Sequence, residues 1–225
     1  MKTSKIRIAI DGPAGAGKSS TSRMVANALN LRYIDTGALY RALAWHVKNN
    51  GFSEKQEAAV KNLLDDFSVE FKTEHGINRI FLKDMEITSE IRTKSVSMAA
   101  STVSSYPFVR KALFSIQRDF ADEGDVVMEG RDIATVIMPD AEYKFFLTAS
   151  VESRAERRWK ELSEKEKKET TLEEMIKDIV KRDKQDSERK TAPLKKAEDA
   201  LEIDNSDMTL EETVDKIVSL VRKGL

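Results

Sequence analysis

A glycine-rich loop joins the first strand that the sequence predicts to the first helix. Residues 12–19 read Gly-Pro-Ala-Gly-Ala-Gly-Lys-Ser, which fits the pattern G-x-x-x-x-G-K-S. The run 6–10 before the loop is rich in isoleucine, as strands are, and the run 19–29 after it is compatible with a helix. This succession of strand, loop and helix is typical of α/β folds, in which helices cover a parallel sheet.

The same loop has the chemistry of a triphosphate site. Its glycines let successive backbone N–H groups turn toward one anion, and the next helix adds its positive N-terminal end. We expect Lys18 to reach the β- and γ-phosphates and the Ser19 hydroxyl to ligand Mg²⁺. The alternative, a glycine-rich turn with a chance lysine, is disfavoured by the strand and helix around it. The predicted ATP-binding residues are Gly12, Pro13, Ala14, Gly15, Ala16, Gly17, Lys18, Ser19 and Ser20.

The composition fits one α/β domain with an insertion. The chain has 225 residues, 40% hydrophobic and 34% charged, and its net charge of −1 gives no overall attraction to nucleic acid or anionic membranes. It has no cysteine, which excludes disulfides and thiolate metal sites and fits a reducing compartment. No apolar run approaches the roughly 20 residues of a membrane span, and no signal peptide precedes the first strand. We therefore expect a cytoplasmic protein.

Short strand-like runs alternate with helical ones along most of the chain. Strands are expected at 6–10, 32–34, 125–129, 143–147 and 200–203. Helices are expected at 19–29, 38–49, 53–65, 95–122, 151–161, 172–189 and from 209 onward. Three further short runs (68–72, 79–83 and 85–88), separated by turns at 74–76 and 83–84, predict a small antiparallel sheet inserted into the α/β chain. The charged run 163–169 is interpreted as a solvated turn.

One predicted helix carries charged residues where an apolar stripe would continue. On the helix at 172–189, Met175, Ile179, Arg182, Asp186 and Arg189 follow a 4-3-4-3 spacing and therefore share one face. This face begins apolar and then becomes charged, which suits a helix that leaves the core and enters an anion cavity. A ladder of surface ion pairs is an equally good interpretation of this helix alone, because Arg182 and Asp186 are four residues apart.

Other arginines support the cavity interpretation. Gly130-Arg131-Asp132 directly follows a predicted central strand, and in parallel α/β sheets ligands bind beyond the carboxyl ends of the strands. Taken one at a time, the others are better explained as surface charges. These others are Arg41, Arg110, Arg154, Arg157 and Arg158, and Arg131 is the exception.

With these residues in view, the chain resembles the bacterial cytidylate kinases of the nucleoside monophosphate kinase superfamily. The phosphate-binding loop is generic, whereas DTGALYR (35–41), GRD (130–132) and RDKQDSER (182–189) are specific in combination. The resemblance runs nearly from end to end. It covers residues 8–20, 33–42, 90–101, 107–113, 129–150, 154–158, 181–189 and 200–207.

The resemblance implies a three-layer P-loop fold with a central parallel sheet, a small antiparallel-sheet insert in the monophosphate-binding region, and a helical lid. It implies a single kinase domain over 1–225 and a monomer. The core would take about 1–37, 100–150 and 190–225, the monophosphate-binding region with its insert about 38–99, and the lid about 154–172.

The resemblance also implies how an acceptor nucleotide is held. A guanidinium binds phosphate oxygens bidentately, which suits a phosphate clamp. The positions that match the clamp are Thr36, Arg41, Arg131 and Arg189. Arg182 and Asp186 match positions at the ribose, where a carboxylate accepts from hydroxyls.

Three residues, Ser101, Arg110 and Asp132, match the positions that read cytosine. The chemistry agrees, since a carboxylate accepts from the N4 amine of cytosine and an arginine donates to its N3 and O2. Uracil would turn a carbonyl toward Asp132 and be repelled. The implied acceptors are therefore CMP and dCMP.

The implied reaction is transfer of the γ-phosphoryl group of ATP, bound with Mg²⁺, to the monophosphate. Phosphoryl transfer is mainly a matter of positioning and charge neutralisation, so no side-chain base is assigned. The predicted catalytic residues are Lys18, Arg131, Arg154, Arg157 and Arg158, the last three from the lid. The loop 204–206 matches a segment near the donor base.

The chain departs from the family pattern at two positions. Glu129 stands where the family usually has Asp, and Ala134 where it usually has Gly. Glu129 keeps the negative charge, one methylene farther out. Ala134 matters only if the backbone there needs a positive φ.

Three alternative functions remain. A P-loop kinase for another small acceptor, such as shikimate or gluconate, would not need Ser101, Arg110 and Asp132. A GTPase-like switch needs an N-K-x-D sequence, which the chain lacks. A nucleic-acid binder is disfavoured by the net charge of −1.

Overall fold

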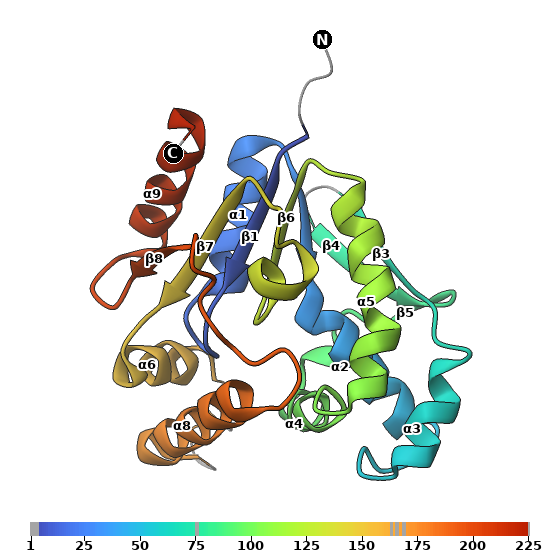
Figure 1. The fold of residues 1–225 in the computed structure, drawn as a ribbon. Helices are drawn as coiled ribbons and strands as arrows, with labels where there is room; N and C mark the ends of the chain where they lie inside the picture. The colour runs from blue at the N-terminus through green and yellow to red at the C-terminus, as the bar shows by residue number, and fades with distance from the viewer. Residues whose placement is uncertain (1–4, 75–76, 163, 165–166, 168–169, 225) are drawn as a thin grey trace.

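A five-stranded parallel sheet forms the centre of the molecule (Figure 1). The structure is a computed structural model that describes residues 5–74, 77–162, 164, 167 and 170–224. The strand order is β2-β6-β1-β7-β8, and every neighbouring pair runs parallel. The strands are β1 (Arg7–Asp11), β2 (Arg32–Asp35), β6 (Val126–Gly130), β7 (Tyr143–Thr148) and β8 (Leu201–Asp204).

Helices cover both faces of this sheet, because successive side chains of each strand point to opposite faces. Ile8 and Ile10 of β1 pack with α1 (Lys18–Leu29) and α9 (Leu210–Lys223). Ala9 lies in a second cluster, formed with α5 (Pro107–Asp122) and with the single π-helical turn η2 (Ile133–Ile137). The three-layer arrangement predicted from the sequence is confirmed.

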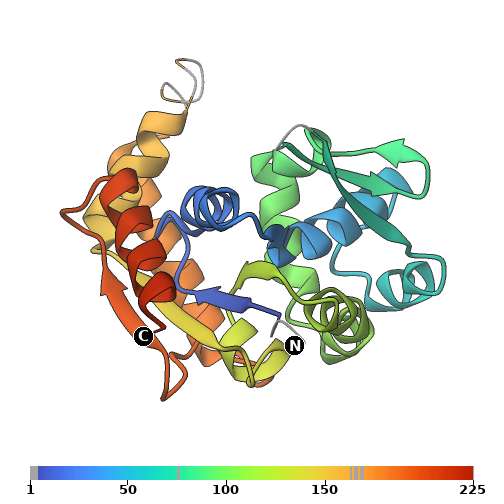
Figure 2. The same ribbon diagram turned by 90° about the horizontal axis from the view of Figure 1, so that it is seen from above.

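A second, smaller sheet stands apart from the central one, as Figure 2 shows. It is antiparallel, with the order β3-β4-β5. Its strands are β3 (Val69–Glu74), β4 (Ile77–Leu82) and β5 (Met85–Glu86). Its neighbouring helices are α2 (Thr36–Asn49), α3 (Glu57–Leu64), the short η1 (Glu90–Arg92) and α4 (Lys94–Val103). The predicted insert is confirmed, although residues 75–76 of its first turn lie outside the described residues.

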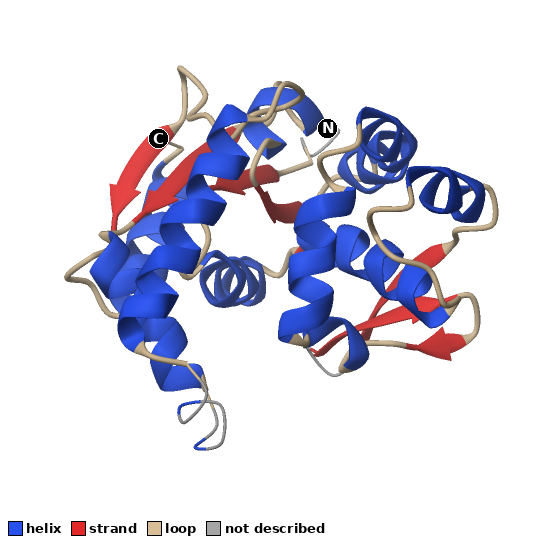
Figure 3. Cartoon of the chain, turned by 90° about the horizontal axis from the view of Figure 1, so that it is seen from below, coloured by secondary structure: helices blue, strands red, loops and turns tan. Residues whose placement is uncertain are grey.

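Two further helices pack against each other beyond the sheet (Figure 3). Ala155 of α6 (Val151–Glu161) meets Met175 and Ile179 of α8 (Leu172–Glu188) in a small buried cluster. Of the charged run 163–169, only Glu164 and Lys167 are described, and they form an ion pair. None of the described helices is both long and apolar enough to cross a membrane.

Two predicted helix boundaries differ from the structure. The helix expected from residue 53 begins at Glu57, after a turn that the Gln56 N–H closes by donating to the Ser53 carbonyl at 3.0 Å, with the Gln56 side chain accepting the Ser53 N–H at 2.7 Å. The helix expected over 95–122 is two helices, α4 and α5. Pro107 begins α5, and the residue before a proline is held out of the helical region, as Tyr106 is with ψ 123°.

Candidate active site

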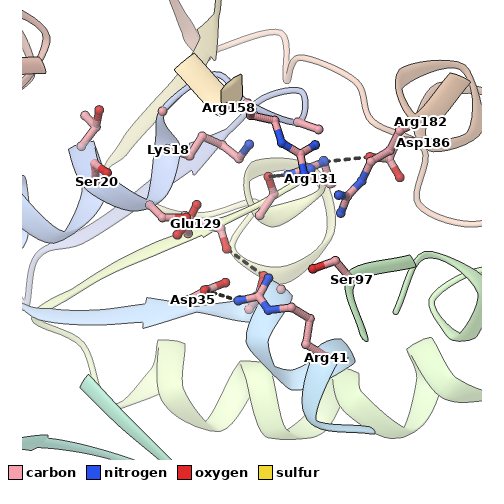
Figure 4. Close-up of a pocket in the computed structure, with 18 of the residues that line it drawn as sticks. Lys18, Ser20, Asp35, Arg41, Ser97, Glu129, Arg131, Arg158, Arg182 and Asp186 are labelled. Atoms are coloured by element: carbon pink, nitrogen blue, oxygen red, sulfur yellow. Dashed lines mark hydrogen bonds and ion pairs between the residues drawn. The ribbon is translucent and has the colours of Figure 1, made fainter. Parts of the chain in front are cut away.

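A cavity of about 580 Å³ opens where the phosphate-binding loop meets the ends of the strands (Figure 4). Residues from the loop, α2, α4, α6, α8 and the segments after β6 and β8 line it together. The predicted site residues among them are Ala14, Gly15, Gly17, Lys18, Ser19, Ser20, Thr36, Arg41, Ser101, Arg110, Arg131, Asp132, Arg157, Arg158, Arg182, Asp186 and Arg189. Predicted residues outside the lining are Gly12, Pro13, Ala16 and Arg154.

The phosphate-binding loop has the conformation that its glycines allow. A Cβ on Gly12 would lie 1.9 Å from the Leu147 carbonyl oxygen, so only glycine fits against β7 there. Gly17 has a φ of 80° and immediately precedes Lys18, the first residue of α1. Lys18 is buried, and its ammonium donates to the Pro13 carbonyl at 2.7 Å. Burial, and then the nearby Arg131, lower the pKa of Lys18, which means that its charge is poorly compensated without an anion.

The segment after β6 brings charged residues into the opposite part of the cavity. Asp132 accepts from Arg110 at 2.5 Å and from Arg189 at 3.2 Å, and all three side chains are buried to about nine-tenths. The guanidinium of Arg110 also lies over the Tyr40 ring, 5.4 Å from its centre. The sequence-predicted base-reading pair is therefore in contact in the structure.

The charged end of α8 enters the cavity rather than forming a surface ladder. Asp186 accepts from Nε of Arg131 at 2.8 Å and is buried (Figure 4). Burial alone would raise the pKa of Asp186, but Arg131, followed by Arg182, lowers it. The Arg182 Nε is buried without a hydrogen-bond partner among the described residues. Burial, and then the repulsion of Arg131, lower the pKa of Arg182 to about 10.

Another ion pair stands at the start of α2. Arg41 donates to Asp35 at 2.6 Å, and the other carboxylate oxygen of Asp35 caps the helix through the Ala38 N–H at 3.1 Å. Thr36 donates its hydroxyl to the Glu129 carbonyl at 2.7 Å, which holds α2 against the end of β6. Tyr33 donates its hydroxyl to the Glu129 carboxylate.

The three arginines of α6 occupy different places. Arg157 binds the Asn205 side chain at 2.9 Å and its carbonyl at 2.5 Å, and Asn205 in turn donates to the Ala16 carbonyl at 3.1 Å. Arg158 lines the cavity and has no ion-pair partner in the described part of the chain. Arg154 is only 4% exposed and binds the Ala14 carbonyl and Asp183 at 3.0 and 2.6 Å. These contacts fit a structural role, in which Arg154 connects the phosphate-binding loop to α8. Its catalytic role stays a prediction.

Both departures from the family pattern are accommodated. Ala134 is not among the residues with positive φ, so it can replace glycine without strain. Glu129 is buried at the cavity wall, where burial and then Asp35 raise its pKa. Ser19, Asp35 and Glu129 give the cavity that Lys18 lines three oxygen-bearing side chains.

Sequence reasoning missed several residues of the site. Asp35 could have been predicted, since it immediately precedes Thr36 in the DTGALYR segment and a carboxylate before a helix is a capping signal. Arg92 and Ser97 also line the cavity, and both fall within the matching segment 90–101. Asp11 and Asp183 also fall within matching segments, 8–20 and 181–189, but their roles could not be predicted because their partners come from distant parts of the chain.

A phosphate-binding loop at the strand ends, facing a pocket of arginines, places this chain among the ATP-dependent P-loop phosphotransferases. The family model described as "Cytidylate kinase" matches residues 8–223, and the chain belongs to that family. A cytidylate kinase of Halalkalibacterium halodurans is 45% identical over 97% of this chain and 98% of its own. One of Clostridium tetani is 46% identical over 98% and 96%.

A solved structure supports the fold alone. An uncharacterized protein of Eubacterium ventriosum, 15% identical, superimposes with a TM-score of 0.51 over 97% of this chain and 99% of its own. The likeness agrees with the three-layer arrangement of the central sheet.

Proposed function

We propose that the protein transfers the γ-phosphoryl group of ATP to CMP or dCMP, giving ADP and CDP or dCDP. The observation that carries this proposal is the buried Asp132, held by Arg110 and Arg189 inside the same cavity as Lys18. A carboxylate and a guanidinium side by side offer an acceptor for the amine of cytosine and donors for its ring acceptors. Ser101, from α4, lines the same region.

The arginines supply the electrostatic part of the mechanism. Lys18, Arg131 and Arg158 point into one space (Figure 4), where negative charge gathers on the oxygens of the group in flight. The acceptor is a phosphate anion near neutral pH, so no proton needs to be removed before attack. Arg41 and Arg189, with Thr36, would hold the acceptor phosphate, and Arg182 and Asp186 the ribose.

The residues present also fit a magnesium ion. Ser19, Asp35 and Glu129 line the cavity and offer the oxygen ligands that Mg²⁺ prefers. Among the described residues no cluster of three or more His, Cys, Asp or Glu is placed to hold a metal by itself. We therefore infer that Mg²⁺ arrives with ATP, held by Ser19 and the substrate phosphates, with Glu129 and Asp35 behind it. When bound, it would neutralise charge on the triphosphate.

The three-part division of the chain belongs to the same proposal. The segment 154–172 would close as a lid and exclude water, which suppresses hydrolysis of ATP. The region 38–99 would carry the acceptor. We further infer a cytoplasmic monomer with no nucleic-acid or membrane partner, which the net charge of −1 and the absence of cysteine support.

A coupled assay with ATP and a panel of monophosphates tests the proposal. CMP and dCMP should be phosphorylated fastest, and UMP and AMP more slowly. Faster turnover of UMP or AMP than of CMP would contradict the assignment of cytosine. A P-loop kinase for shikimate or gluconate would ignore all four nucleotides.

The variant Asp132→Ala separates base recognition from ATP binding. We expect kcat/KM for CMP to fall by about 100-fold, because a buried site built to hydrogen-bond its substrate is left unpaired. The dissociation constant for ATP should change by less than about threefold, since no phosphate-binding N–H is touched. Equal losses for both substrates would remove the role given to Asp132. The exposed Asp84→Ala is the matched control.

A further inference from the structure

Asp11 connects the two halves of the cavity through the backbone. It is the last residue of β1 and directly precedes Gly12, and it lies beside Gly130 of β6 in the parallel ladder. Its two carboxylate oxygens accept the N–H groups of Ile133 at 2.9 Å and Ala134 at 2.7 Å. These residues come immediately after Asp132. One side chain therefore joins the start of the phosphate-binding loop to the segment that presents Arg131 and Asp132.

The two N–H groups need this carboxylate. Ile133 and Ala134 open the π-helical turn η2, whose internal hydrogen bonds begin with the N–H groups of residues 136–138. The first N–H groups of any helix lack an internal partner and need an outside acceptor. Ile133 and Ala134 are buried, so water does not satisfy them.

Burial of the Asp11 carboxylate is energetically unfavourable. Asp11 is 1% exposed, and burial raises its pKa to about 6 against the opposing effect of the two N–H donors. A fully buried carboxylate is expensive unless its hydrogen bonds are made. No charged side chain is hydrogen-bonded to it in the described part of the chain, which makes its role that of an anchor for backbone.

We propose that Asp11 is a positioning residue that sets the acceptor selectivity of the kinase by fixing Asp132 relative to the phosphate-binding loop. The inference rests on the proposed function, because it takes Asp132 as the group that reads the base. A rival explanation is purely electrostatic: the negative charge of Asp11 supports the charge of the nearby Lys18. The two explanations predict different results when Asp11 is changed. The positioning role predicts a loss of selectivity for CMP over UMP, and the electrostatic role predicts a higher KM for ATP.

The variant Asp11→Asn distinguishes them. Asparagine has nearly the same shape but offers one acceptor oxygen and one NH₂ group, so one of the two N–H groups meets a donor. We expect the ratio of kcat/KM for CMP to that for UMP to fall about tenfold, the loss typical of one strong buried hydrogen bond. The KM for ATP should stay within about twofold of the wild type. An unchanged ratio, or a loss carried by the KM for ATP, overturns the proposal.

Two further measurements keep the test decisive. Amide hydrogen exchange of the unliganded Asp11→Asn protein should be faster at Ile133 and Ala134 than in the wild type, and unchanged exchange there contradicts the anchoring whatever the substrate proves to be. Should that variant not fold, Asp11→Ser is measured against the same criteria. Asp215→Asn, an exposed position on α9, is the control. A wild type that does not prefer CMP to UMP refutes the proposed function separately.

Discussion

At the level of single residues, four of the eight arginines that line the cavity among the described residues are paired with carboxylates. Arg110 and Arg189 meet Asp132, and Arg131 meets Asp186. A buried guanidinium without a partner would be costly, so these carboxylates keep the arginines charged and oriented before a substrate arrives. The same carboxylates accept from the hydroxyl and amine groups proposed for the acceptor.

A change at Glu129 is the most direct test of the proposed magnesium site. In Glu129→Gln the charge disappears while the amide keeps one acceptor for the Tyr33 hydroxyl. We expect the Mg²⁺ concentration that gives half-maximal activity to rise about tenfold at fixed ATP, because a carboxylate behind the ion is lost. A magnesium titration of activity measures this.

The control for that titration is Glu211→Gln, an exposed position in the first turn of α9. It should leave the magnesium requirement unchanged. A Glu129→Gln enzyme with the wild-type requirement and a reduced kcat would mean that Glu129 serves Tyr33 and β2 rather than the ion.

At the level of elements, α6 and α8 are tied to the phosphate-binding loop through the ion pair of a buried arginine, Arg154, with a partly exposed aspartate, Asp183. Arg154 of α6 binds Asp183 of α8 and the carbonyl of Ala14 in the loop. Gly15 allows this approach, since a Cβ there would lie 3.1 Å from the Cβ of Arg154. The position of α8 is thereby linked to the shape of the donor site.

The variant Asp183→Asn tests this link. Removing the carboxylate leaves a buried guanidinium without its charged partner, at a cost of about 2 kcal/mol, because Asp183 itself is partly exposed. For a chain of this size the melting temperature should fall by roughly 4–8 °C. We also expect the KM for ATP to rise more than the KM for CMP. Calorimetry and steady-state kinetics measure both effects.

Asp178→Asn, an exposed position on the same helix, is the matched control and should change neither quantity. A lower melting temperature with an unaltered KM for ATP would make the pair a support for the helices alone. It would then have no influence on the loop.

The sequence predicted the parts of the site that are contiguous or periodic. The loop around Lys18 is one motif, and the stripe of α8 follows helical spacing, so both could be placed before the structure was known. Arg154, by contrast, was grouped with Arg157 and Arg158 because all three match the lid of the family. The structure separates them, because the phosphate-binding loop packs against the first turn of α6 and its Ala14 carbonyl accepts a hydrogen bond from Arg154.

The role of Asp11 could not be predicted, for a different reason. Its partners are backbone N–H groups 122 and 123 residues away, and backbone groups leave no trace in a sequence. The boundary between α4 and α5 could have been predicted from the sequence, since Pro107 marks it. The residues on both sides of Pro107 are helical, as predicted, so only the break between the two helices was missed.

At the level of the whole molecule, a chain with net charge −1 places Lys18 and eight arginines around one cavity. Arg182 shows what this costs: it is partly buried, its buried Nε has no described hydrogen-bond partner, and burial and then Arg131 lower its pKa. The empty enzyme is therefore less stable than its packing alone would allow. An anion in the cavity should recover that stability.

The variant Arg182→Met tests this balance between stability and function. Methionine would extend the apolar stripe of Met175 and Ile179 by one turn and remove the charge of Arg182 together with its buried, unpartnered Nε. We expect the unliganded variant to be more stable by about 1 kcal/mol, a rise in melting temperature of roughly 2–4 °C. CMP at about 100 times its dissociation constant should stabilise the wild type by about 2.7 kcal/mol.

At the same CMP concentration the variant should gain much less, because it binds the nucleotide more weakly. Thermal unfolding with and without CMP measures both effects, and cytidine, which lacks the phosphate, gives the baseline. Arg23→Met, at an exposed position of α1, should match the wild type in both conditions. If Arg182→Met instead lowered the melting temperature of the empty enzyme, Arg182 would be stabilising there. The cavity would then carry no electrostatic strain for a substrate to relieve.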